Sequence, residues 1–76
     1  MSIAPHGVEL QALASAKLRG YTDIEVDSVR HDAQQAETWN VFLHANIHGK
    51  MKHLQADVKE ISETKWQTMR VVQTSG

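Results

Sequence analysis

The chain has 76 residues, with nine acidic and eight basic side chains, no cysteine and a formal net charge of −1. This length fits one small domain, residues 1–76, that removes only about 60% of its unfolded surface from water, so contacts with partners matter to it. The absence of cysteine excludes disulfides and thiolate metal sites, and the near-neutral charge argues against a whole-protein footprint for nucleic acid. No apolar run approaches the roughly 20 residues of a membrane helix, and residues 1–7 lack a signal-peptide pattern. We therefore expect a cytoplasmic protein without membrane contact.

The first predicted element is an alanine-rich amphipathic helix over about residues 8–19. Gly20 fits the left-handed position that ends a helix. The start stays open, because Pro5 fits either the first helical turn or a preceding loop. We expect the apolar stripe that packs on the rest of the domain to consist of Leu10, Leu13, Ala14 and the stem of Lys17.

The alternation of side chains over residues 22–31 predicts the first strand. Ile24 and Val26 alternate with acidic residues, and the phase shifts at Val29, which indicates a bulge or an early end. Residues 32–37 are polar and without β-branched side chains, so we expect an exposed loop there. The three acidic side chains expected on the solvent side of the strand are Asp23, Glu25 and Asp27.

We expect the next two strands at about residues 38–47 and 50–60. They should form a hairpin that turns at His48-Gly49. Opposed residue numbers then sum to 97, which sorts the side chains into an apolar and a polar face. The apolar face pairs Trp39, Val41, Leu43 and Ala45 with Val58, Ala56, Leu54 and Lys52. The polar face pairs Asn40, Phe42, His44 and Asn46 with Asp57, Gln55, His53 and Met51.

A fourth strand is expected at about residues 64–73, and either of its faces fits the core. One choice turns Trp66, Thr68, Arg70 and Val72 inward, and the other turns Gln67, Met69 and Val71 inward. We favour the first, because pairing about Ser62 places Trp66 opposite Val58 and beside Trp39. Arg70 would then have to reach solvent at an edge. Residues 74–76 should fray. The predicted fold is α+β, with one N-terminal helix packed on a four-stranded antiparallel β-meander.

The sharpest candidate for chemistry is His44 directly opposite His53, because side chains so paired can reach one divalent cation. Such a site needs further ligands, which His31 or Glu37 would supply, or a second pair in a symmetric dimer. A metal-linked homodimer is therefore one alternative. We expect no enzymatic activity and no cofactor. The sequence does not combine a nucleophile, a base and a pocket into a catalytic site, and its glycines form no phosphate-binding loop.

The favoured function is a small non-enzymatic interaction module, which acts as a regulator, adaptor or inhibitor of a larger protein or binds a second copy of itself. It would use its uncovered sheet face or an edge strand, because Phe42 and Met51 are expected there as exposed apolar side chains. The residues expected to bind the partner are Phe42, His44, Met51, His53 and Gln55. The alternative is nucleic-acid binding through the basic second half, with Lys50, Lys52, Lys59, Lys65 and Arg70.

Overall fold

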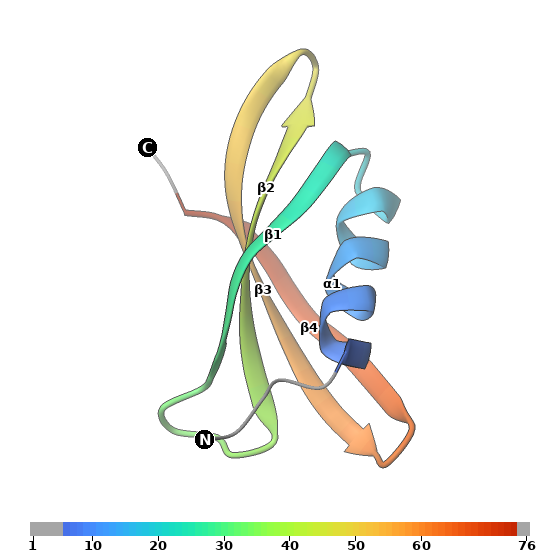
Figure 1. The fold of residues 1–76 in the computed structure, drawn as a ribbon, viewed down its shortest axis with the longest axis vertical. Coiled ribbons are helices and arrows are strands. Elements are labelled where there is room, and N and C mark those ends of the chain that lie inside the picture. The colour runs from blue at the N-terminus through green and yellow to red at the C-terminus, as the bar shows by residue number, and fades with distance from the viewer. Residues whose placement is uncertain (1–5, 75–76) are drawn as a thin grey trace.

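The protein has one helix packed against one face of a four-stranded antiparallel sheet, which confirms the predicted α+β fold (Figure 1). The structure is a computed structural model and describes residues 6–74, so Pro5 and residues 75–76 lie outside the described residues. The strand order along the sheet is β1-β2-β3-β4. The elements are α1 (His6–Leu18), β1 (Thr22–His31), β2 (Thr38–Ile47), β3 (Lys50–Ser62) and β4 (Lys65–Gln73).

The central hairpin of β2 and β3 has the register predicted from its alternation. All its pairs, from Thr38 with Lys59 to Ile47 with Lys50, have residue numbers that sum to 97. The turn residues His48 and Gly49 both have positive φ, 53° and 76°, as the tight turns that match strand twist require. The apolar face of this hairpin is buried beneath α1, and the polar face lies on the other side of the sheet.

The first strand lies at one edge of the sheet and is bulged twice, between Thr22 and Glu25 and between Val26 and Ser28. The second bulge is the phase shift predicted at Val29, which lies opposite Val41 and packs against the core. A bulge inserts one unpaired residue and therefore exchanges the faces of all later residues. Asp23, inside the first bulge, has a positive φ of 50°.

The predicted register of the fourth strand is wrong. Of the four side chains predicted to point inward, two do so and two do not. Trp66 lies opposite Glu60, not opposite Val58, because β3 continues to Ser62 before the chain turns. Thr68 takes the place opposite Val58, and an irregularity follows before the next pair. The inward set therefore changes along the strand, so that neither predicted alternation holds throughout. Trp66, Thr68 and Val71 lie on the side of α1, whereas Arg70 and Val72 lie on the opposite side.

The helix packs on the sheet through the side opposite to the predicted stripe. Leu10 is 53% exposed, Ala14 and Lys17 are exposed, and Leu13 is half-buried. The covered sheet face already holds large side chains such as Trp39 and Trp66, so small helix residues allow the closest approach. The residues of α1 that are buried against the sheet are Val8, Ala12, Ser15 and Ala16. We call these the inner face of α1, and Leu10, Leu13, Ala14 and Lys17 its outer stripe.

The helix ends as predicted at Gly20. The Gly20 N–H donates to the carbonyl of Lys17 (3.0 Å) and the Tyr21 N–H donates to that of Ala16 (3.2 Å). This pair of bonds satisfies carbonyls that a helix end otherwise leaves open, and it requires the positive φ of 93° at Gly20. The chain then turns directly into β1, which places the start of that strand beside the last turn of α1.

Candidate functional site

The five predicted partner-binding residues lie together on the side of the sheet away from α1, which we call the helix-free face. Phe42 pairs with Gln55, His44 pairs with His53, and Met51 lies at the next position along the same column. Phe42 is half-buried, not exposed as predicted, because the guanidinium of Arg30 lies 5.6 Å from the centre of its ring. Met51 is 57% exposed and His53 is exposed.

His44 is held by two carboxylates of the neighbouring strand. Its Nδ1 lies 2.7 Å from Asp27 Oδ1, and its Nε2 lies 3.1 Å from Glu25 Oε2. Glu25 lies opposite His44, and Asp27, two residues further along β1, lies on the same face by ordinary strand alternation. The ring of His53 is 6.3 Å away, measured between ring centroids. The carboxylates therefore already occupy both nitrogens through which His44 would bind a metal.

The further ligands proposed for the histidine pair do not join it. His31 stacks on Trp39, with ring centroids 3.6 Å apart, and this pair lies on the side of the sheet that α1 covers. Glu37 follows in the exposed loop after it. Within residues 6–74 no three His, Cys, Asp or Glu side chains are placed to hold one metal ion.

A second polar cluster crosses from β3 to β4 on the helix-free face. The Asp57 carboxylate accepts a bond from Arg70 Nε at 2.6 Å and another from the Gln55 side-chain amide at 3.0 Å. Asp57 is only 14% exposed at its side chain, so water screens this ion pair less than an open surface pair. Gln55, one of the predicted partner-binding residues, is thereby fixed in orientation.

The loop between β1 and β2 has its own polar anchor. Asp32 Oδ1 accepts hydrogen bonds from the backbone N–H groups of Gln34 (2.8 Å) and Gln35 (3.1 Å). The Gln34 bond above all holds the pKa of the Asp32 carboxyl below its usual range, and the Gln35 bond acts in the same direction. The loop is thus exposed, as predicted, but it has a defined turn.

The five basic residues of the nucleic-acid alternative do not gather into one patch. Lys50 begins β3 beside the β2–β3 turn, whereas Lys65 begins β4 beside the β3–β4 turn at the other end of β3. Lys52 lies in the row that α1 covers, opposite Ala45, whereas Arg70 lies on the helix-free face and is paired with Asp57. Lys59 is half-buried and pairs with Thr38.

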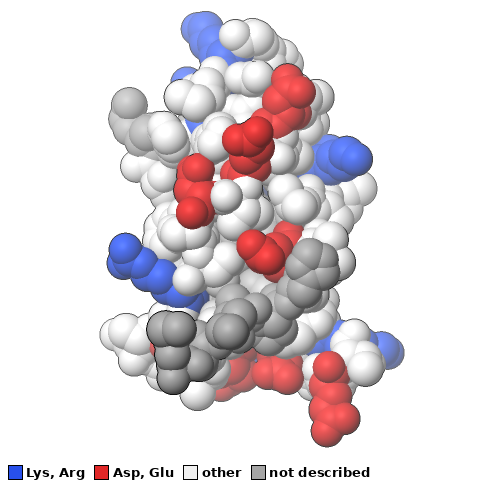
Figure 2. Space-filling model, viewed as in Figure 1, with Lys and Arg blue, Asp and Glu red and all other residues white. Residues whose placement is uncertain are grey.

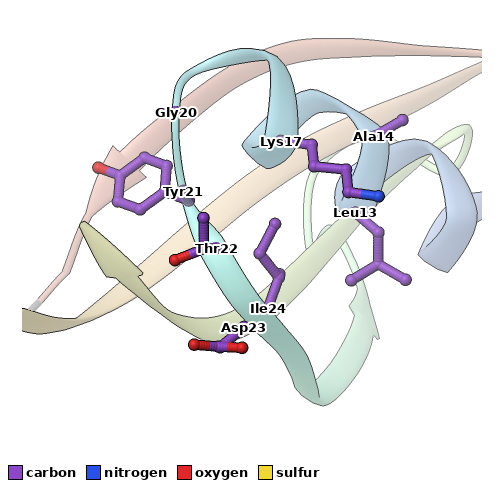
Figure 3. A pocket seen from close by; sticks show the side chains of 8 residues that line it. All are labelled: Leu13, Ala14, Lys17, Gly20, Tyr21, Thr22, Asp23 and Ile24. Atoms are coloured by element: carbon purple, nitrogen blue, oxygen red, sulfur yellow. The ribbon is translucent and has the colours of Figure 1, made fainter. Parts of the chain in front are cut away.

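The structure adds a feature that the sequence analysis missed, a groove between α1 and β1 (Figure 3). Its volume is about 620 Å³. Leu13 from the helix and Ile24 from the strand extend into the same space (Figure 3). The signal was present in the sequence as the outer stripe of α1, but that stripe was assigned to the core. The residues that line the groove are Leu13, Ala14, Lys17, Gly20, Tyr21, Thr22, Asp23 and Ile24.

Comparison with known proteins gives no match among protein-family models, curated proteins or solved structures. The part of the chain that the structure describes contains no helix with the length and apolar character needed to cross a membrane.

Proposed function

We propose that the protein is a non-enzymatic interaction module that binds a larger protein through the helix-free face and thereby regulates, adapts or inhibits it. The observation that carries this proposal is that α1 covers one side of the sheet, and no described element lies over the other. A small domain with one open sheet face has a flat, continuous surface to offer. The proposal keeps the cytoplasmic location expected from the sequence.

The face is favoured over the sheet edges as the binding surface. Addition of a partner strand needs a regular row of free N–H and C=O groups along an edge strand. The pairing of β1 with β2 is irregular at two places, and so is that of β3 with β4. Irregular edges of this kind are a common protection against strand addition.

The side chains on the helix-free face are already held in position. Carboxylates fix His44, the Asp57 carboxylate fixes Gln55 and Arg70, and Arg30 lies over Phe42. Binding to such a surface loses less side-chain entropy than binding to a mobile one. We expect a partner surface with an apolar centre for Phe42 and Met51 and a polar rim, the usual composition of a non-obligate interface.

A photo-crosslinking amino acid at position 51 tests this proposal in extracts of the source cells. We expect one discrete protein adduct, which an excess of the wild-type protein suppresses. Phe42→Ala should compete at least tenfold more weakly, because it removes the aromatic at the centre of the face. Position 61 is the matched control, because Ile61 is 52% exposed against 57% for Met51 and lies near the other end of β3.

Two results would contradict the proposal. One is the same set of adducts from positions 51 and 61, which would mean contact without selectivity. The other is undiminished competition by Phe42→Ala, which would exclude the named surface. Phe42 is half-buried, so circular dichroism must first show that Phe42→Ala is folded. Met51→Ser, at an exposed position, is a second competitor that should not affect folding.

A further inference from the structure

A row of four side chains crosses the whole width of the helix-free face. Ser28 lies opposite Phe42, Phe42 opposite Gln55, and Gln55 opposite Val72. We call these four residues the Phe42 row. Phe42 is half-buried and Val72 is 38% exposed, and no described element lies over either of them. Two further side chains of β2 point to this face on each side of Phe42, so the row lies at the middle of the face.

The charge along β1 changes sign across the Phe42 row. Glu25 lies opposite His44, one row to one side, and its side chain is 74% exposed. Arg30 lies one row to the other side and is also exposed. The Arg30 guanidinium lies over the Phe42 ring, and no carboxylate of residues 6–74 forms an ion pair with it. Figure 2 shows the acidic side chains gathered along β1.

We propose that two copies of this chain associate face to face through their helix-free faces, about a two-fold axis that runs along the Phe42 row and across the strands. Such an axis reverses the strand direction of the second copy and exchanges the rows on either side of the Phe42 row. Glu25 of each copy then meets Arg30 of the other, and the two Phe42 rings meet at the axis. The dimer would mask the surface assigned above to a larger partner, and this regulatory role rests on the proposed function.

The order of the charges favours a second copy as the occupant of this face. A two-fold axis parallel to the strands would place each row against itself, so that Glu25 would face Glu25 and Arg30 would face Arg30. The axis across the strands instead places opposite charges together at two equivalent positions. It also brings the exposed His53 opposite Asp57 of the other copy, because these residues lie one row to either side of Gln55 on β3. The face is therefore complementary to itself in one orientation.

The area of the face is sufficient for a moderately stable dimer. Four strands of about ten residues, spaced about 4.8 Å apart, present a surface of about 20 by 30 Å, or on the order of 600 Å². Two copies would then bury about 1,200 Å², the lower end of the range for specific interfaces. Sheets packed face to face lie about 10 Å apart, a distance that glutamate and arginine side chains from opposite sheets can span. We therefore expect a dissociation constant in the micromolar range.

Charge exchange between two separate variants tests the inference on purified protein. Arg30→Glu sets acidic side chains against each other across the axis and Glu25→Arg sets basic ones, so each variant should raise its own dimer dissociation constant at least about tenfold. An equimolar mixture of the two restores both ion pairs. In sedimentation velocity from about 1 µM to about 1 mM, which brackets a micromolar dissociation constant, the wild type should approach twice its 8.5 kDa mass. The mixture should dimerise at concentrations where each variant alone is monomeric.

Two control variants make matching charge changes on the other side of the sheet. Lys50→Glu and Glu60→Arg alter exposed residues of β3 whose strand partners, Ile47 and Trp66, pack against the core beneath α1. Both controls should dimerise like the wild type. Circular dichroism checks that every variant is folded, as we expect for substitutions at exposed positions. A wild type that stays monomeric throughout overturns the inference, and so does a mixture of folded charge variants that fails to dimerise or a control that is itself monomeric.

The dimer and the proposed function can fail separately. No partner protein enters the sedimentation measurement, and in the extract experiment a cross-linked second copy is recognised by its mass of twice 8.5 kDa. Capture of a larger protein by a chain that stays monomeric would overturn the dimer and leave the proposed function intact. A dimer for which no larger partner is captured would support the interface and overturn its masking role.

Discussion

The two sides of α1 differ in the opposite sense from the usual amphipathic helix. The inner face is built from Ala12, Ala16, Ser15 and Val8 and is buried, whereas the outer stripe carries leucines and is largely exposed. Side-chain hydrophobicity alone would predict the reverse, with the leucines of the outer stripe buried and the small residues of the inner face exposed. The side of α1 that is buried is therefore determined by the space that the side chains of the sheet leave free. A close-packed interior has no room for additional methylene groups.

The sheet below explains why that space is small. Its covered face already contains Trp39, Leu43 and Leu54, with Trp66 partly buried at the side of β4. With such large side chains on the sheet, α1 contributes only small ones, and its Ser15 hydroxyl bonds the Thr68 hydroxyl instead of packing a larger group. The apolar volume of the core thus comes mainly from the sheet.

Enlarging one alanine on each side of α1 tests this contrast directly. Ala12 is fully buried, so Ala12→Leu must displace the sheet or the helix, and we expect it to lower the free energy of unfolding by about 3 kcal/mol. Ala14→Leu adds the same atoms to the exposed stripe and should change stability by less than about 0.5 kcal/mol. Urea denaturation at micromolar concentration measures both without interference from self-association. Equal effects of the two substitutions would contradict the assignment of the faces.

The same contrast explains which parts of the fold were predictable from the sequence. The β2–β3 register follows from strict alternation, since a slip of one residue would exchange all the side chains of a strand between faces. The end of α1 follows from Gly20, because few other residues adopt its backbone conformation. Both signals are local. The side of α1 that is buried depends on what the sheet presents, and that information is distant in the sequence.

The fourth strand and the candidate site show a second limit. The irregularity after Thr68 reverses the facing of Arg70, and no local signal in the sequence marks it. The predicted pair of His44 and His53 is present, but its carboxylate partners come from a bulged neighbouring strand. Alternation was sufficient to place residues on a face. It was not sufficient to identify the contacts they make with another strand.

A small residue is also required at Gly7, on the side of α1 that faces β4. A Cβ at this position would overlap the indole of Trp66, mainly at Nε1 and Cδ1. Gly7→Ala gains up to about 1 kcal/mol of helix propensity but must displace a rigid ring, at a cost of about 1–3 kcal/mol. We expect the free energy of unfolding to fall by about 1 kcal/mol.

A double-mutant cycle isolates this contact. In a Trp66→Leu background the ring is gone, so Gly7→Ala should be neutral or slightly stabilising. The coupling between the two substitutions, measured by urea denaturation, should be about 1–2 kcal/mol. Additive effects would mean that the helix and β4 do not approach as closely at Gly7 as described.

The smallest effect is expected away from both sides of α1, in the loop that Asp32 organises. Its carboxyl pKa is lowered in the folded protein by the backbone N–H of Gln34, so the folded state prefers the charged form. Its contribution to stability is therefore present above the pKa of the unfolded chain and is lost as the pH falls through the folded value. Asp32→Asn keeps a side-chain oxygen for the turn but does not titrate.

The urea midpoint of the wild type should exceed that of the Asp32→Asn variant at about pH 6, and the difference should shrink towards about pH 3. Glu37→Gln in the same loop corrects for the general loss of one negative charge, and a corrected difference that stays constant with pH would exclude this role for Asp32.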